Sequence, residues 1–172
     1  MTPATRGRMP TGICIDSLTT FDRETLSALA LLQIIAWGRR PNPEEVEVRR
    51  QRLEGELEQS DPDRTMMFVA RERDVIVGEC RVKRDSHDPD VWILSHLAVH
   101  PDHRRQGAGR SLVQASIVFA RSRGAATIRS ETHVDNRASI AFHKSVGFVD
   151  DGRFTAVDGD EKIAFSMLLR TD

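Results

Sequence analysis

Residues 104–109 read Arg-Arg-Gln-Gly-Ala-Gly and place two cations and two glycines shortly after an apolar run. Glycine lets the backbone approach a ligand closely, and the first N–H groups of a following helix carry partial positive charge. A turn with these properties is suited to binding a phosphate group. The guanidinium groups of Arg104 and Arg105 add charge-assisted hydrogen bonds. We therefore predict an anion-binding turn here.

Two elements must position this turn. The run Val91–Val99 is apolar at both parities, as a central strand covered on both faces would be. After the turn, the spacing of apolar residues over 108–123 predicts an amphipathic helix that Gly124 ends. The turn is thus expected between the end of a strand and the first turn of a helix.

The rest of the chain alternates strand and helix patterns. Asn42 followed by Pro43 is a typical helix start, with a capping side chain before a proline that needs no N–H partner. No repeat or linker divides the chain, so we predict one domain over 1–172, with 1–12 as a flexible terminus. The predicted strands are 11–16, 65–72, 75–83, 91–99, 127–132, 148–155 and 162–170, and the predicted helices are 22–37, 42–59, 108–123 and 136–146.

Composition excludes several functional classes. With 172 residues, 30% of them charged, 39% apolar, and a formal net charge of −1, the chain is typical of a folded domain and not of a dedicated nucleic-acid binder. No apolar run reaches the roughly 18 residues of a membrane span. Cys14 and Cys80 lack metal-site spacing and are expected as buried, reduced thiols. The first dozen residues carry no secretory signal, so we expect a cytoplasmic protein without a metal, nucleic-acid or membrane partner.

A second motif follows at 136–148, Asn-Arg-Ala-Ser-Ile-Ala-Phe-His-Lys-Ser-Val-Gly-Phe. Together the two motifs resemble the GNAT superfamily of acyl-CoA-dependent N-acetyltransferases, whose patterns are Arg/Gln-x-x-Gly-x-Gly/Ala, after a Leu-Ala-Val-His-Pro run, and Asn-x-x-Ala-x-x-Leu-Tyr-x-x-x-Gly-Phe. The close match covers 97–148, and residues 1–60 match only in element order. The resemblance implies an α/β fold with a mixed, mostly antiparallel sheet of about seven strands, a V-shaped splay between the fourth and fifth, and four flanking helices.

The resemblance also implies acetyl-CoA as co-substrate. The turn would direct backbone N–H groups at the pyrophosphate, and the backbone of Leu97 and Val99 would pair with the pantetheine amides as an added strand does. Asn136 either binds the cofactor's arm or is a plain helix N-cap, and the two roles are compatible. The implied cofactor-binding residues are Leu97, Ala98, Val99, Arg104, Arg105, Gln106, Gly107, Ala108, Gly109, Arg110, Asn136, Phe142 and His143.

Acetyl transfer to an amine needs a neutral amine and a proton for the departing thiolate. In relatives that acetylate N-terminal amines, a glutamate at the position of Glu131 serves as base. Alternatively, Glu131 is only a solvated carboxylate at the end of a strand. The base is then a water wire or bulk solvent. The family's proton donor is a tyrosine, but this chain has none and carries His143 there. His143 is either an imidazolium acid or a structural residue.

Three other histidines lie near the cofactor motif. If Leu97 faces the cofactor, strand alternation turns His96 away, unless a bulge shifts the register. Relatives often place a carboxylate or histidine where this chain has Ile93 and Ser95, which cannot act as strong bases. His100 and His103 flank the turn and are expected to face solvent.

These observations predict an N-acetyltransferase that moves an acetyl group from acetyl-CoA to a primary amine by direct attack in a ternary complex. The expected acceptor is a small molecule: an amino sugar, a polyamine or an amino-acid derivative. The alternatives are a protein N-terminus or lysine as acceptor, and a non-catalytic acyl-CoA-binding regulatory module. A homodimer is left open. The acidic residues of the 42–59 helix either attract a cationic acceptor or form a solvated face.

Overall fold

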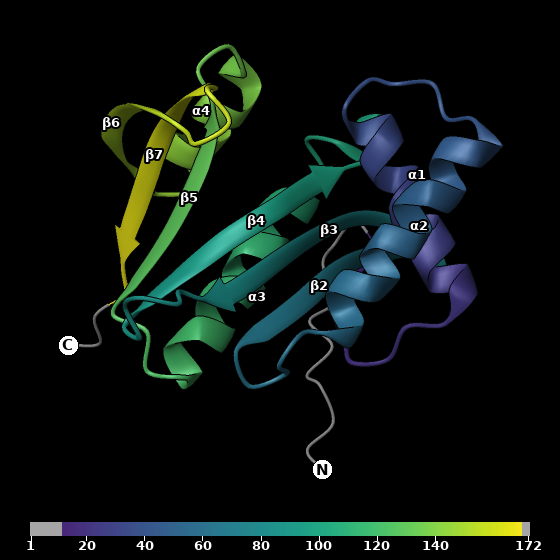
Figure 1. Cartoon of the computed structure of the whole chain (residues 1–172), viewed down its shortest axis with the longest axis horizontal. Helices are drawn as coiled ribbons and strands as arrows, with labels where there is room; N and C mark the ends of the chain where they lie inside the picture. Colours follow the sequence, from purple (N-terminus) through teal and green to yellow (C-terminus); the bar gives the residue numbers. More distant parts are fainter. Residues whose placement is uncertain (1–11, 170–172) are drawn as a thin grey trace. The chain divides into compact units, whose positions relative to one another are not determined.

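The computed structural model describes residues 12–169 of the chain (Figure 1). Residues 1–11 of the predicted flexible terminus lie outside the described residues, as do Thr11 of the first predicted strand and Arg170 of the last. The elements are β1 (Ile13–Leu18), α1 (Arg23–Ala36), α2 (Pro43–Glu58), β2 (Thr65–Glu72), β3 (Val75–Arg84), β4 (Val91–Val99), η1 (Pro101–His103), α3 (Ala108–Ser122), β5 (Thr127–His133), α4 (Arg137–Ser145), β6 (Val149–Thr155) and β7 (Glu161–Leu168).

Every predicted helix and strand is confirmed, with ends displaced by a residue or two. The helix starts are capped as the sequence indicates: the side chain of Asp22 accepts the Thr25 N–H at 2.7 Å, and that of Asn42 accepts the Glu45 N–H at 2.8 Å. The short 3₁₀ helix η1 was not predicted, because a single turn carries no hydrophobic periodicity.

The strands form one seven-stranded sheet in the order β1-β2-β3-β4-β5-β7-β6. The β1–β2, β5–β7 and β6–β7 pairs are antiparallel, whereas β4 and β5 run parallel. The parallel pair is short, because only Val91–Ile93 of β4 pairs with Thr127–Arg129 of β5, although β5 continues to His133. This limited pairing agrees with the predicted splay between the fourth and fifth strands.

The chain divides into two compact units, of which the first includes residues up to Arg81 together with His96–Ser116. In it α1 and α2 lie side by side (Figure 1). Apolar side chains from both helices pack with those of β2 and β3. Burying one large apolar side chain fully stabilises the folded state by roughly 1.5–3 kcal/mol. This core contains Leu26, Leu29, Ala30, Leu32, Leu53, Leu57, Met67, Val69 and Ile76.

The two faces of β3 meet different helices in this unit. A Cβ on Gly78 would lie 3.2 Å from Leu112 of α3, and the Cys80 sulfur lies 3.2 Å from the Ser116 hydroxyl of α3. Cys80 is buried as expected, whereas Cys14 is only half-buried. Since side chains alternate along a strand, Glu79 and its neighbour at 81 project to the opposite face, toward α1 and α2.

The second unit comprises Val82–Ser95 and the chain from Ile117 onward. Its core includes Trp92, which lies edge-on to Phe119 with ring centroids 5.5 Å apart. Ile128 of β5 and Phe165 of β7 are fully buried, and the Phe165 ring stacks on His143 of α4. These contacts fix β5, the strand that carries the acceptor-side residues predicted from the sequence.

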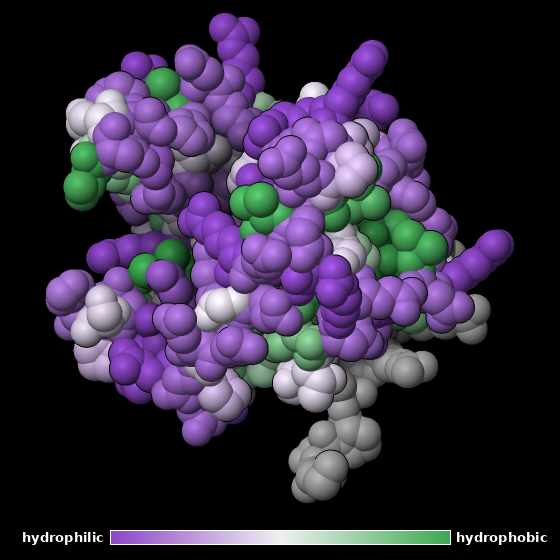
Figure 2. Space-filling view, turned by 45° about the vertical axis from the view of Figure 1, so that its right-hand side comes forward, coloured by the Kyte–Doolittle hydropathy of each residue, from purple (hydrophilic) through white to green (hydrophobic). Residues whose placement is uncertain are grey.

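Polar side chains predominate on the face drawn in Figure 2, interrupted by small apolar areas. Among residues 12–169, no helix has the length and apolar character needed to cross a membrane.

Candidate functional site

The predicted anion-binding turn has an alternating backbone. Arg105 and Gly107 both adopt left-handed conformations, with φ of 60° and 90°, and α3 begins at Ala108. The Ser111 N–H donates to the Gly107 carbonyl at 3.0 Å, which starts the hydrogen-bond ladder of the helix. The first N–H groups of an α-helix are not used by its own hydrogen-bond ladder, and turns of this kind aim successive N–H groups at an anion.

Arg104 secures the turn to its surroundings. Its Nη2 donates to the carbonyl of Ala36, the last residue of α1, at 2.6 Å, and its Nε donates to the Val99 carbonyl at 3.1 Å. The cation therefore sits at the negative end of the α1 dipole. A guanidinium has five N–H donors, so these bonds leave others for a ligand.

His100 and His103 are less exposed than expected. Each side chain keeps only about a quarter of its exposure, 29% and 26%, and the two rings meet edge to face at 5.5 Å. His103 also lies 3.2 Å from the carboxylate of Glu72 on β2. Both side chains are therefore half-buried, neither fully exposed nor in the core.

The backbone of β4 is irregular at His96, whose φ of 54° is left-handed. Leu94 and Ala98 are buried, whereas His96, which regular alternation would place on their face, is exposed. The parity argument assumes regular alternation, which the backbone of β4 does not keep at His96. Regular strand alternation therefore does not predict the direction of the His96 side chain.

Asn136 is the N-cap of α4, since its side-chain oxygen accepts the Ser139 N–H at 3.0 Å. This confirms the capping alternative and leaves the amide nitrogen of Asn136 for other contacts. Phe142 is half-buried, with its ring edge-on to His143 at 6.1 Å.

His143 is a core residue with only 3% of its surface exposed. Its Nδ1 lies 2.7 Å from the Ser139 carbonyl, and its Nε2 lies 2.9 Å from the Ser130 hydroxyl. Because a carbonyl can only accept, Nδ1 carries the hydrogen and Nε2 accepts from Ser130. The ring stacks on Phe165 at 4.7 Å. Burial lowers the pKa of His143, so the ring is neutral at neutral pH.

Glu131 lies on β5 in an exposed ion pair. Its Oε1 is 2.8 Å from the Nζ of Lys162 on β7, with 51% of the Glu131 side chain and 16% of the Lys162 side chain exposed. The hydrogen bond to Glu131 raises the pKa of Lys162. The carboxylate is therefore accessible to a ligand and already has one cationic partner.

The burial pattern of β5 places these two residues on different faces. Ser130 and Thr132 are buried, while Glu131 and His133 are exposed. His143 bonds Ser130 and so lies on the buried face, whereas Glu131 points to the exposed face.

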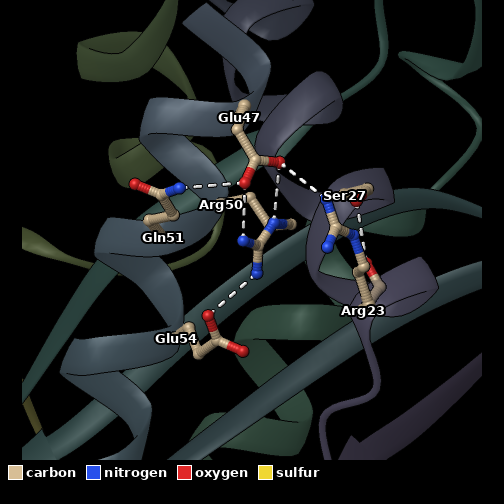
Figure 3. A network of polar contacts seen from close by, with 6 residues as sticks. All are labelled: Arg23, Ser27, Glu47, Arg50, Gln51 and Glu54. Atoms are coloured by element: carbon tan, nitrogen blue, oxygen red, sulfur yellow. Dashed lines mark hydrogen bonds and ion pairs between the residues drawn. The ribbon is translucent and has the colours of Figure 1, made fainter. Parts of the chain in front are cut away.

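The acidic surface of α2 is largely neutralised by arginines (Figure 3). Arg50 is only 7% exposed and donates to Glu47 at 2.7 Å and to Glu54 at 2.8 Å. Arg23 of α1 reaches the same Glu47 at 3.4 Å. This network supports the alternative of a packed surface helix over that of a free acidic face.

A buried acid on β3 was missed in the sequence. Glu79 is fully buried, and its neighbours include Gln33 of α1 and Arg81. The available signal was a lone acid inside the apolar run 75–82. In the described part of the chain, no group of His, Cys, Asp and Glu residues is arranged to hold a metal ion.

This chain belongs to the acetyltransferase (GNAT) family, because the model of that family matches residues 30–148, more than half of its length. The match includes both sequence motifs, the turn and the α4 segment, and confirms the resemblance on which the site was predicted.

Curated relatives match over a shorter stretch. N-alpha-acetyltransferase 30 of Schizosaccharomyces pombe is 36% identical over 83 residues, 47% of this chain and 55% of that protein. The [Ribosomal protein bS18]-alanine N-acetyltransferase of Escherichia coli K12 is 44% identical over 59 residues, 34% of this chain and 40% of that protein. The chain thus spans about half the length of the curated relatives it matches.

Solved structures share the fold. The ribosomal-protein-S18-alanine N-acetyltransferase from Escherichia coli superposes with a TM-score of 0.69 at 22% identity, covering 93% of this chain and 96% of that one. Nourseothricin acetyltransferase superposes with a TM-score of 0.58 at 29% identity, covering 65% of this chain and 69% of that one.

Proposed function

We propose that this chain transfers an acetyl group from acetyl-CoA to a primary amine. The observation that carries the proposal is the left-handed turn at Arg105 and Gly107, which leads into α3 within the family match. The backbone N–H groups of such a turn are suited to a pyrophosphate, and the Arg104 guanidinium has five donors of which two are used by Ala36 and Val99. We also propose that 1–172 works as one domain, because the family match runs through both compact units.

In this proposal the acetyl donor is held by the residues predicted from the sequence. The backbone of Leu97, Ala98 and Val99 binds the pantetheine arm, and residues 104–110 bind the pyrophosphate. Asn136 and Phe142 line the arm from α4. The geometry of His143 favours its structural alternative: a buried, neutral ring with both nitrogens engaged supports the β5–α4 contact instead of donating a proton.

The carboxylate proposed to contact the acceptor nitrogen is Glu131. It is half exposed, and Lys162 holds it in place until a second amine arrives. Attack of the neutral amine on the thioester forms the C–N bond and breaks the C–S bond. Glu131 takes one proton from the nitrogen, and the departing thiolate gains one.

For the acceptor, the names of the two curated relatives favour the α-amino group of a protein. The nourseothricin acetyltransferase, at 29% identity, supports the small-molecule amine predicted from the sequence as a second candidate. Mass spectrometry of a competition between an alanine-starting peptide, a polyamine and an amino sugar tests this ranking. Acetylation of the peptide alone supports a protein acceptor, and acetylation of the small amines alone overturns it.

A further inference from the structure

Four polar side chains gather inside the first compact unit: Gln33 of α1, Arg49 of α2, and Glu79 and Arg81 of β3. Only 2% of Gln33, none of Glu79 and 8% of Arg81 is exposed. Arg49 Nη1 donates to the Gln33 side-chain oxygen at 3.1 Å, and Arg81 Nη1 donates to Glu56 of α2 at 3.0 Å. Three elements thus contribute to one buried polar cluster.

Several atoms of this cluster lack a hydrogen-bond partner among the described residues. They are Nε of Arg49 and Nε and Nη2 of Arg81, while the buried Glu79 carboxylate has the Gln33 side chain as its hydrogen-bonding neighbour. Buried polar groups of native proteins are nearly always hydrogen-bonded, through ordered water where protein partners are lacking. The cluster therefore has the donors and acceptors to hold water around the Glu79 carboxylate.

This carboxylate exchanges its proton in the neutral range. Burial raises the pKa of Glu79 to about 7, and the opposing effects of Gln33, Arg81 and Arg49 favour its anion. The groups that face it from α1, α2 and β3 are these three, with Glu56 linked through Arg81. A carboxyl group with a pKa near the working pH is well matched to accepting and releasing a proton.

The cluster lies beside the strand proposed to bind the cofactor. The His100 N–H at the end of β4 donates to the Val77 carbonyl of β3 at 2.8 Å, so this part of β3 borders β4. Toward the surface, Arg49 lies over the ring of Trp37, whose exposed fraction is 56%. Arg49 and Gln33 thus connect an exposed surface to the buried Glu79.

On the basis of the proposed N-acetyltransferase function, we propose that Glu79 accepts, through water held by Gln33 and Arg81, the proton that the acceptor's ammonium group loses before it attacks. The steps balance. R–NH₃⁺ and the Glu79 carboxylate become R–NH₂ and a neutral carboxyl group, which later releases this proton to solvent. The second nitrogen proton leaves as the amide forms, and the departing thiolate gains a proton.

The test compares wild type, Glu79→Gln and the exposed control Glu58→Gln, using the amine that gives most thiol release. In wild type and the control we expect kcat/KM to rise with pH through the neutral range. In Glu79→Gln this limb is lost and kcat/KM at about pH 8 falls roughly a hundredfold, while KM for acetyl-CoA is unchanged. If kcat/KM of a folded Glu79→Gln variant still rises with pH in the same way, the role of Glu79 is overturned, while the acetyl-transfer proposal stands.

A second measurement needs no turnover. In a carbon-13 NMR titration of glutamate-labelled protein, one carboxyl signal should titrate in the neutral range and be absent from Glu79→Gln. If no such signal is found, the proposal is overturned. A wild-type protein that releases no thiol with any amine overturns the acetyl-transfer proposal itself, and with it the role of Glu79, so the two failures are distinguishable.

Discussion

The ring of His143 and the carboxylate of Glu131 lie on opposite faces of β5. Ser130, which bonds the histidine, is buried, and the next residue along the strand carries the exposed carboxylate. The acid and base implied by the family resemblance therefore lie on opposite sides of this strand, His143 against its buried face and Glu131 on its exposed face. This geometry leaves Glu131 as the accessible group and makes His143 a support for α4.

Replacing His143 with phenylalanine tests this support role. We expect kcat at saturating acetyl-CoA to stay within about threefold of wild type, because a buried neutral imidazole donates no proton. We expect stability to fall by about 1–3 kcal/mol, because the Ser130 hydroxyl loses its buried partner. Steady-state kinetics and chemical denaturation measure the two effects. A hundredfold loss of kcat in a variant of normal stability would instead make His143 the proton donor.

Replacing Gly107 with aspartate tests the anion-binding turn. The change puts a carboxylate where a pyrophosphate is proposed to bind, at a left-handed φ of 90°. We expect calorimetric titration to detect little or no acetyl-CoA binding. Gly159→Asp is the matched control, because Gly159 has a φ of 89° and open space around its Cα. Equal affinity in the two folded variants would refute a phosphate site in the turn.

Replacing Glu131 with glutamine tests the exposed carboxylate. We expect kcat to fall roughly a hundredfold while acetyl-CoA affinity is unchanged, since the change removes a proton acceptor and keeps the shape. Asp151→Asn is the control, an exposed carboxylate on β6 that accepts a hydrogen bond from Ser166. If both variants keep wild-type turnover, the nitrogen's proton goes to water and not to Glu131.

Stability against pH tests the buried state of Glu79. The pKa of Glu79 is about 7 in the folded protein and 4.5 ordinarily, so folding favours its neutral form. The stability that Glu79 contributes is therefore fully present below pH 4.5 and is lost as the pH rises through 7. We therefore expect wild type to lose on the order of a few kcal/mol of stability between about pH 5 and about pH 8. Glu79→Gln should flatten this dependence in urea denaturation. An equally steep loss in the variant would show that another group causes it.

The order and bounds of the elements follow from the sequence because each has a local signal. Asn42 with Pro43 marks the start of α2, and the helical spacing after Gly107 marks α3. The irregular backbone at His96 has no such signal, because its φ of 54° depends on how β4 is packed and paired.

The candidate site was predictable in part. The motifs located the left-handed turn at Arg105 and Gly107 and the helix cap at Asn136, because turn geometry and capping depend on residues close together in the sequence. The position of His143 in the motif did not reveal its burial, because the Ser130 hydroxyl and the Phe165 ring reach it from other strands. The buried state of Glu79 likewise depends on side chains from α1 and α2 that no local pattern on β3 could supply.

The most direct test of the central claim is thiol release from acetyl-CoA by the wild-type protein across peptides, polyamines and amino sugars, with Gly107→Asp as the inactive control. We predict thiol release that requires an amine and the wild-type turn. The amount of acetylated amine formed should equal the amount of thiol released. Acetyl-CoA binding without amine-dependent release would contradict the claim and favour a non-catalytic acyl-CoA-binding module.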